Sequence, residues 1–496
     1  MEVLHLIRSW RNRLAPINQI PPEILSLVPD FWDINERDQE VITLTHVCRA
    51  WREVFTSRSA LWTDFDCIDE DKTRVYLERS KSSPIRLQLT RDSGLTPSDP
   101  FFEIIPHAIG RLKALYIKGT PEHLKDITAR LSHPAPLLEI LFIHGGCEST
   151  PHRSPVLTSA LFDGDISSLH ELCLVSIRTE LPWRNMINLT LFVLAYMSPG
   201  EVSVGQVLGF LKGAPHLHEI QFHFTTLTSC AQDERLVSPA CLKRIEINSC
   251  GPPSLLLNQL LIPVGAELTI EAESLSSLIK DHLPRSLDNL RNFSNFSTIR
   301  LDLDRSNPGI QFSGPNGQVN TTTPASRTDP TCPVLESLAQ FDTSKIERLE
   351  IDCGDPPSSG PPHRTLLPMK ALRTLTLSQC NRPYSFISAL YPDMSSLEVV
   401  VCPKLEELTL RTDGKIFDIK RVTGMAAARA SKGAKLKSVG IIGQDKFARV
   451  DALELGEHVL HVKCGLEVDG ANGGSGGSGG ESVMRYLVSR LMFVLE

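Results

Sequence analysis

The stretches LKALYI (Leu112–Ile117) and LEILFI (Leu138–Ile143) repeat one pattern, in which the first, fourth and sixth residues are Leu, Ile, Val or Phe. The pattern occurs eleven times. The other occurrences begin at Leu169, Leu189, Leu217, Leu242, Phe296, Ile346, Leu372, Leu405 and Leu436. Alternation of apolar residues over so short a stretch is typical of a strand with one buried face. Its recurrence predicts a repeat architecture, because each unit buries its apolar face only against its neighbours.

The segments between these strands carry helix signals. In TPEHLKDITARL, Thr120 is suited to the N-cap and Pro121 to the first helical position. Leu124, Ile127 and Leu131 then fall on one face. The first six occurrences begin 20 to 31 residues apart, close to the about 20–29 residues of leucine-rich repeats. The chain from 84 to 465 therefore resembles a leucine-rich-repeat-like solenoid, an α/β fold with a parallel sheet and right-handed connections.

The repeat pattern also predicts a candidate client-binding face. If the recurring apolar positions are buried, the residues between them face the concave side of the sheet. The main candidates are Tyr116, Phe142, His144, His223, Arg244, Arg300, Arg348 and Arg411. Their neighbours on that face are Lys118, Ile140, Val175, Leu191, Val193, Glu219, Gln221, Glu246, Asp302 and Glu350. The early half is apolar and the later half charged, so we expect a client near Phe142. A register slip of one residue, or an insertion that covers them, would instead bury the early residues.

The N-terminal part predicts a small helical module. In INQIPPEILSLVPDFW (Ile17–Trp32), Pro21 and Pro22 are suited to the start of a helix, and Pro29 would end it. A second helix, capped by Asp38, would carry one apolar stripe. That stripe comprises Val41, Leu44, Cys48, Trp51 and Phe55. So small a unit cannot bury all these apolar groups by itself, which favours docking on a partner.

The residues PINQIPPEILSLV, THVCRAWREV and a closing LW resemble the F-box, and together they span Ile17–Trp62. In that family the module binds a Skp-type adaptor and, through it, a cullin in a ubiquitin ligase. By motif position, the resemblance assigns adaptor contacts to Ile20, Pro21, Pro22, Ile24, Leu25, Val47, Cys48 and Trp51. The connection PDFWDINERDQE is longer and more polar than in the compact form of the motif.

These features predict a division of the chain into five parts. Residues 1–16 form an N-terminal extension, 17–65 the F-box and 66–83 a connecting helix. The solenoid of 84–465 carries a Pro-, Gly- and Thr-rich loop insertion near 304–335, which we expect to be irregular. Residues 466–496 comprise a Gly/Ser linker and a C-terminal helix. A repeat body of this type resembles that behind the F-box in many fungal F-box proteins.

Composition and missing motifs argue against several other classes of function. A net charge of −7 gives no basis for a nucleic-acid surface, and no apolar run approaches the about 20 residues that span a bilayer. The sequence has no C-x-x-C pair, phosphate-binding loop, nucleophile elbow or zinc-binding helix motif. We therefore expect an intracellular protein, cytoplasmic, nuclear or both, with no catalytic residues, cofactor, metal, nucleic-acid partner or membrane partner.

Three hypotheses about function follow. The first is a non-catalytic substrate-recognition subunit of a Skp-cullin-F-box ubiquitin ligase, whose repeats bind an unidentified client protein. The second is a leucine-rich-repeat interaction scaffold, whose F-box-like helices only cap the solenoid. The third, a repeat-fused hydrolase, needs a pocket that no motif indicates. The first two differ in whether the edge from Ile20 to Leu25 is exposed together with Trp51 or buried against the repeats.

Overall fold

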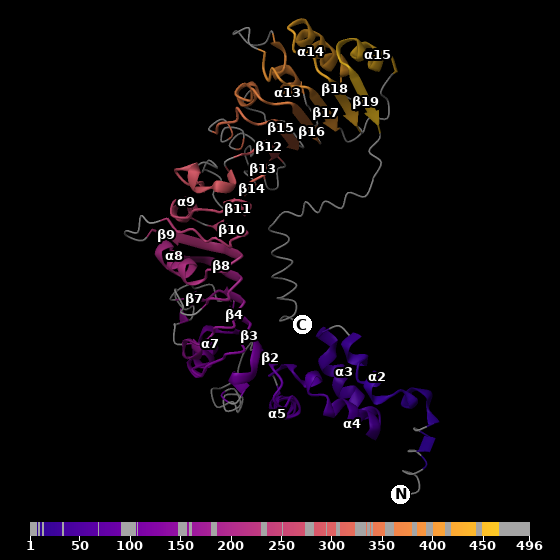
Figure 1. The fold of residues 1–496 in the computed structure, drawn as a ribbon, viewed down its shortest axis with the longest axis vertical. Coiled ribbons are helices and arrows are strands. Elements are labelled where there is room, and N and C mark those ends of the chain that lie inside the picture. The colour runs from indigo at the N-terminus through magenta and orange to yellow at the C-terminus, as the bar shows by residue number, and fades with distance from the viewer. Residues whose placement is uncertain are drawn as a thin grey trace. The chain divides into compact units, whose positions relative to one another are not determined.

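The computed structural model describes residues 7, 10, 11 and 14–465, apart from internal stretches of which the longest are 91–105, 147–155, 273–281, 323–333 and 353–361. The described residues fall into two compact units. Unit 1 contains those up to residue 198 together with 213–215, and unit 2 contains 199–212 and those from 216 onward. Figure 1 labels the elements along the chain.

Unit 1 begins with short helices. They are η1 (Pro16–Gln19), α2 (Pro22–Leu25), η2 (Val28–Phe31), α3 (Ile34–Val47), α4 (Arg49–Ser57) and η3 (Ser59–Trp62). As predicted, a helix starts at the proline pair, with Pro21 as N-cap and Pro22 at N1. It ends at Leu25, however, so Pro29 lies inside a 3-10 turn instead of ending the first helix.

The predicted second helix is in fact two helices. Cys48 takes an extended conformation, with φ −160° and ψ 175°, and serves as the N-cap of α4. Its carbonyl oxygen accepts the first helical hydrogen bond, from Arg52 N at 3.0 Å. Helix α3 also begins at Ile34, before the expected cap at Asp38. The apolar stripe survives this break, because Val41, Leu44, Trp51 and Phe55 are all buried.

The rest of unit 1 is a parallel sheet. Its strands, in spatial order, are β1 (Asp64–Asp66), β2 (Ile85–Thr90), β3 (Leu112–Gly119), β4 (Ile140–Gly145), β6 (Glu171–Val175) and the start of β8 (Leu191–Ser203). A separate parallel pair joins β5 (Val156–Leu157) to β7 (Arg178–Thr179). Strand β1 overlaps the end of the range assigned to the F-box, so parallel pairing begins before residue 84.

Two α-helices and two 3-10 turns accompany this sheet. Helix α5 (Glu70–Arg79) is capped by Asp69, whose side chain accepts from Lys72 N. Helix α7 (Pro121–Arg130) has the predicted Thr120 cap and Pro121 at its start, and Leu124 and Ile127 are buried as expected. The 3-10 turns η4 (Ile109–Arg111) and η6 (Leu161–Gly164) lie between strands.

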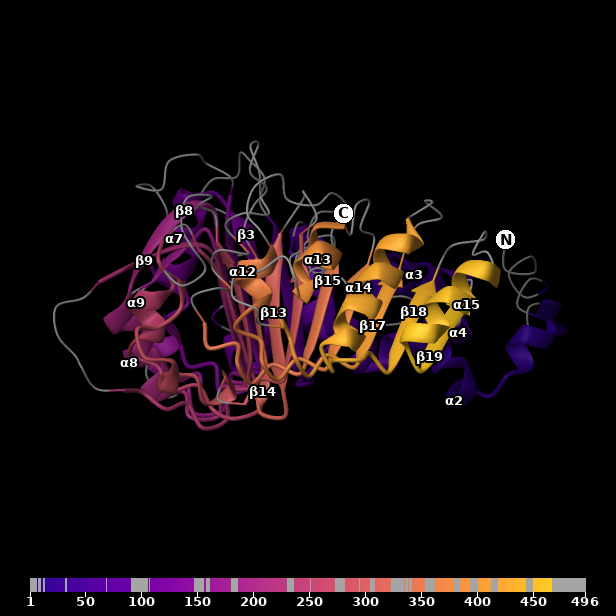
Figure 2. The ribbon, with the colours of Figure 1, turned by 90° about the horizontal axis from the view of Figure 1, so that it is seen from above.

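Unit 2 is also built on a mostly parallel sheet. In spatial order its strands are β9 (Glu219–Thr228), β10 (Arg244–Ser249), β11 (Glu267–Ala272), β14 (Gly317–Thr322), β13 (Gly309–Gly314), β12 (Thr298–Asp302), β15 (Arg348–Asp352), β16 (Thr374–Ser378), β17 (Glu407–Arg411), β18 (Ser438–Ile442) and β19 (His461–Gly465). Its helical elements are α8 (Val204–Gly213), α9 (Ser254–Leu257), η7 (Leu287–Asn289), η8 (Arg291–Phe293), α12 (Pro362–Leu366), α13 (Tyr384–Ala389), α14 (Ile419–Ser431) and α15 (Arg449–His458). Figure 2 shows α13, α14 and α15 side by side along the strands.

Each of the eleven sequence repeats forms a strand, and its recurring apolar residues are buried on one face. In β15 to β18, for example, Leu349, Leu375, Leu408 and Val439 occupy one register row and are fully buried. The residues between these apolar positions lie on the opposite face and include Thr376 and Thr409, which are half-buried. The prediction of an α/β fold with a mostly parallel sheet is therefore confirmed, and its arrangement is compatible with a solenoid.

The expectation of an irregular insertion near 304–335 is wrong for its described part. Strands β13 and β14 form an antiparallel hairpin that inserts between β11 and β12. The turn uses Gly317, whose φ of +133° is accessible to glycine. Buried side chains alternate along both strands, as Ile310 and Phe312 and as Val319 and Thr321. This alternation around a Pro-Asn-Gly turn is typical of a hairpin. The high Pro, Gly and Thr content of the segment had instead favoured an irregular loop.

Candidate functional site

The predicted adaptor contacts divide between the surface and the core of the N-terminal helices. Ile24 and Val47 are 55% and 51% exposed, and Pro21 and Pro22 are exposed as well. The remaining predicted contacts are the half-buried Ile20 and Cys48 and the buried Leu25 and Trp51. The expected docking edge is therefore only partly exposed, because its largest side chain, Trp51, is buried in the core.

Trp51 organises the helices from inside. Its Nε1 donates to Asn18 Oδ1 at 2.6 Å, which joins α4 to η1. Its ring meets Phe55 edge to face, with centroids 5.8 Å apart. A buried aromatic ring with a satisfied polar atom fixes the position of neighbouring chain segments. Trp51 thus holds the exposed segment around the proline pair in place.

Large exposed apolar side chains are concentrated in these first helices. Eight of the seventeen such side chains among the described residues lie within the first 47 positions, about a tenth of the chain. They are Ile7, Trp10, Leu14, Ile17, Ile24, Leu27, Phe31 and Val47. Single exposed apolar residues are ordinary, but a concentration of them is typical of a surface that binds another protein.

The opposite end of the helical segment packs on the first strand and helix that follow it. Trp62 of η3 is fully buried, and its ring lies 4.9 Å from that of Tyr76 in α5. Arg79 lies over the same indole, with 4.2 Å from its Cζ to the ring centroid. Phe65 of β1 packs on Tyr76. The segment is therefore anchored to the sheet through η3.

The expected apolar client surface in unit 1 is not exposed. Phe142, at its predicted centre, is only 2% exposed, and His144 is buried. The pairing register sets Tyr116, Phe142 and Cys173 side by side on β3, β4 and β6. These side chains pack laterally into a cluster with Val175 and Ala195. Neighbouring strands lie about 4.8 Å apart, so large side chains in one row bury one another, which is why this part of the prediction is wrong.

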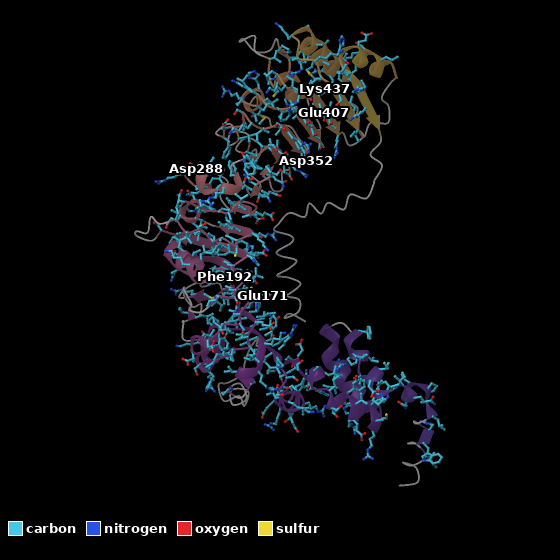
Figure 3. All side chains as sticks on the ribbon, viewed as in Figure 1. Glu171, Phe192, Asp288, Asp352, Glu407 and Lys437 are labelled. Carbon is cyan, nitrogen blue, oxygen red and sulfur yellow. The ribbon has the colours of Figure 1, made fainter. Side chains whose placement is uncertain are left out.

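Three of the predicted charged residues lie on the surface of unit 2. Arg300, Arg348 and Arg411 are all exposed. Arg300 Nη2 lies 3.9 Å from Asp352 Oδ2, and Asp352 is labelled in Figure 3. Exposed pairs of this kind contribute little to stability, so this contact does not prevent Arg300 from binding a partner.

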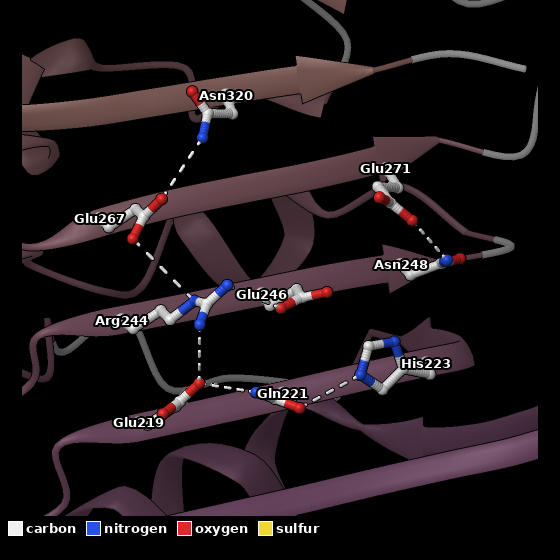
Figure 4. A network of polar contacts seen from close by, with 9 residues as sticks. All are labelled: Glu219, Gln221, His223, Arg244, Glu246, Asn248, Glu267, Glu271 and Asn320. Carbon is white, nitrogen blue, oxygen red and sulfur yellow. Dashed lines mark hydrogen bonds and ion pairs between the residues drawn. The ribbon is translucent and has the colours of Figure 1, made fainter. Parts of the chain in front are cut away.

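A denser polar arrangement lies on β9, β10, β11 and β14, as Figure 4 shows. The register places three residues of each strand on one face, in three rows. The first row is Glu219, Arg244, Glu267 and Gln318; the second is Gln221, Glu246, Thr269 and Asn320; the third is His223, Asn248, Glu271 and Thr322. We call its four carboxylates, Glu219, Glu246, Glu267 and Glu271, the acidic face.

Hydrogen bonds join many of these side chains. Gln221 Nε2 donates to Glu219 Oε1 at 2.6 Å, and Asn248 Nδ2 donates to Glu271 Oε2 at 2.7 Å. Gln318 Nε2 donates to Asn320 Oδ1 at 2.8 Å, and Asn320 Nδ2 reaches Glu267 Oε1 at 3.5 Å. Most of the network is thus held by amide side chains.

Glu246 is the exception within this network. It is fully buried, yet neither carboxylate oxygen has a hydrogen-bond partner. Its nearest cation is Arg244, whose Nη2 lies 3.7 Å from Glu246 Oε2. Burial, reinforced by the surrounding carboxylates and opposed by Arg244, raises the pKa of Glu246 to about 7. A buried carboxyl without a partner is costly and marks a candidate binding site.

His223 lies close to Glu246, on the adjacent strand. Burial lowers its pKa to about 4, so its imidazole is neutral at neutral pH. Its Nε2 lies 3.4 Å from Gln221 Oε1. The sequence pattern had singled out His223 and Arg244 as exposed binding residues, but His223 is buried and Arg244 is about one-third exposed.

Sequence reasoning missed Asn248, Glu267, Glu271, Gln318 and Asn320. Glu267 and Glu271 lie in a degenerate repeat, AELTIEA, and Gln318 and Asn320 lie in the hairpin taken for a loop. The alternation around Val319 in GQVNTT is a strand signal that would have indicated Gln318 and Asn320.

The described residues contain no helix long and apolar enough to cross a membrane. Within the same residues, no group of three or more His, Cys, Asp or Glu side chains is placed to hold a metal ion.

Neither a scan against protein-family models nor a search of curated proteins found a match to this chain.

Proposed function

We propose that this protein is a non-catalytic substrate-recognition subunit of a Skp-cullin-F-box type ubiquitin ligase. The F-box-like helices would dock on a Skp-type adaptor, and through it on a cullin, while leucine-rich-repeat-like strands bind a client protein. The observation that carries the proposal is the concentration of exposed large apolar side chains in the first 47 residues, among them Ile24 and Val47 at two of the motif positions.

The division of labour within the helices supports this proposal. Trp51, bonded to Asn18, would orient the proline pair rather than meet the adaptor directly. Ile24 and Val47 would enter an apolar groove of the adaptor, where burial of each full side chain is worth about 1.5–3 kcal/mol. The chain itself would not act as an enzyme. It would increase the effective concentration of a client near the ubiquitin-charged enzyme, in the cytoplasm, the nucleus or both.

A scaffold without a ligase role is the second candidate. It is favoured by the packing of Trp62 on Tyr76 and of Phe65 on the same ring, because this contact lets the helices cover the end of the sheet. Terminal repeats require such a cap. The two proposals differ in one property: only the first needs the exposed apolar side chains at the other end to bind an adaptor.

Calorimetric titration of the full chain with a Skp-type adaptor tests the proposal. Ile24→Asp and Val47→Asp should each weaken binding by about tenfold or more, because the new carboxylate would be buried without a partner. Leu453→Asp is the control, since Leu453 is an exposed apolar residue of α15 and its substitution should leave binding unchanged. No binding by the wild-type chain, with circular dichroism showing it folded, would reject the ligase role and favour the scaffold.

A further inference from the structure

The acidic face of unit 2 carries more negative charge than its own residues neutralise. Of its four carboxylates, those of Glu219, Glu246 and Glu267 share the guanidinium of Arg244, and that of Glu271 accepts a hydrogen bond from the neutral amide of Asn248. The only other titratable group in these rows, His223, is neutral at neutral pH because burial lowers its pKa. The face is therefore anionic in the part of the chain that the structure describes.

The side chain of Arg244 is only weakly held among these carboxylates. Its Nη1 lies 3.5 Å from Glu219 Oε1, its Nη2 lies 3.7 Å from Glu246 Oε2, and its Nε lies 4.0 Å from Glu267 Oε2. Charge-assisted hydrogen bonds are about 2.7–2.9 Å long, so none of these contacts is one. Arg244 Nε has no hydrogen-bond partner at all. The carboxylates could thus exchange this guanidinium for a better-placed cation.

The arrangement has an accessible rim and a buried centre. Glu219, Arg244 and Glu267 are 30%, 32% and 40% exposed. Glu246 lies between them in the next row, fully buried, and neither of its oxygens accepts a hydrogen bond. A cation that displaces the Arg244 side chain would reach Glu246 directly and supply the hydrogen bonds that this carboxylate lacks.

We propose that the acidic face binds an arginine or lysine side chain of an extended basic segment of a client protein, with Glu246 as the central ligand and Glu219 and Glu267 at the rim. Planar guanidinium groups match carboxylates in a bidentate manner, which favours arginine over lysine. A nucleic acid or an anionic membrane would be repelled by the same charges. That a captured client is then ubiquitylated rests on the function proposed above, whereas the binding itself does not.

Binding at this face should depend on pH. The groups that surround Glu246 are Glu219 and His223 of β9, Arg244 of its own strand, and Glu267 and Glu271 of β11. Glu246 holds a proton in much of the population near neutral pH, and an incoming cation favours its ionised form. Binding therefore releases a proton and becomes tighter as pH rises from 6 to 8.

The test measures fluorescence anisotropy of a labelled Gly-Ser peptide with two central arginines, titrated with the full chain. Peptides with two lysines, two glutamates or two alanines in their place serve as comparisons. At pH 8, Glu246→Gln should weaken binding of the arginine peptide about tenfold. Glu407→Gln, on β17 (Figure 3), is the matched control and should leave binding unchanged. Arg244→Gln should tighten binding, because it removes the competing internal cation.

Several outcomes would overturn the proposal. Equal binding of the arginine and alanine peptides would do so, as would a Glu246→Gln protein that is folded and binds as tightly as the wild type. Loss of peptide binding with millimolar magnesium or spermidine at constant ionic strength would assign the site to small free cations instead. Adaptor binding is measured separately with the same protein preparation, so failure at the acidic face and failure of the proposed ligase role are distinguishable.

Discussion

Replacement of Glu246 by Gln should change how the stability of unit 2 depends on pH. Glutamine keeps the size and shape of the side chain but cannot ionise. In the wild-type protein the pKa of Glu246 is raised from 4.5 to about 7 by burial. The folded state therefore binds this proton more tightly than the unfolded state does. The resulting stabilisation is fully present below pH 4.5 and is lost as pH rises through 7.

The two pKa values set the size of the effect. Between pH 5 and pH 8, the linkage relation gives a loss of about 2.5 kcal/mol from Glu246 in the wild-type protein. His223 acts with the opposite sign: its pKa is lowered to about 4, so its contribution is lost as pH falls below 6.5. Both proteins carry His223, so its contribution cancels when the two are compared at each pH. Relative to the wild type, Glu246→Gln should thus gain about 2.5 kcal/mol between pH 5 and pH 8.

The assay is urea unfolding at pH 5, 6, 7 and 8, followed by circular dichroism. Hydrogen exchange identifies the transition in which β9, β10 and β11 unfold, because a repeat protein need not unfold in one step. Glu350→Gln, at a half-buried position on β15, is the control and should shift stability by less than about 0.5 kcal/mol at every pH. An equal difference between Glu246→Gln and the wild type at pH 5 and pH 8 would refute the reasoning, because Glu246 would then not change its protonation state with pH in the folded protein.

Three further predictions concern packing in unit 2, and urea unfolding checks each of them. Arg429 is fully buried and donates to the carbonyl oxygens of Val401 and Cys402 at 2.7 and 2.8 Å. Arg429→Met should cost about 2–4 kcal/mol by removing both hydrogen bonds, although Cys402 O still accepts from Leu405 N at 3.0 Å. An equal loss in the exposed control Lys420→Met would contradict this. Leu408→Ala, in the fully buried row, should cost about 2–5 kcal/mol, and a loss below 1 kcal/mol would mean that the row is loosely packed. A Cβ at Gly314 would lie 2.5 Å from Asn295 O, so Gly314→Ala should cost about 1–3 kcal/mol; unchanged protection of β13 from hydrogen exchange would show that the hairpin tolerates the clash.

Some properties of this protein follow from short stretches of sequence. Each repeat of the Leu112 type places a strand, because alternation of apolar and other residues is a local property of the chain. The helix that starts at Thr120 and Pro121 is equally local, since its cap and first residue are adjacent in the sequence. The degenerate stretch around Glu267 also forms a strand.

Other properties depend on partners distant in the sequence. Phe142 is buried because Tyr116 and Cys173 stand beside it in the same row, and the register of neighbouring strands decides that contact. The hairpin of β13 and β14 is part of the sheet because β14 pairs with β11 and β13 pairs with β12. The Pro- and Gly-rich composition of this segment does not indicate that pairing.

The candidate site also depends on residues that are distant in the sequence. The sequence by itself determined that Arg244 and Glu246 lie on one face of a strand, since they are two residues apart. Only the tertiary structure decided that Glu219 and Glu267 flank Arg244 and that Glu246 is buried without a hydrogen bond. The physical reason is that charge state and burial are set by neighbours across the sheet, brought together by backbone pairing between strands far apart in the chain.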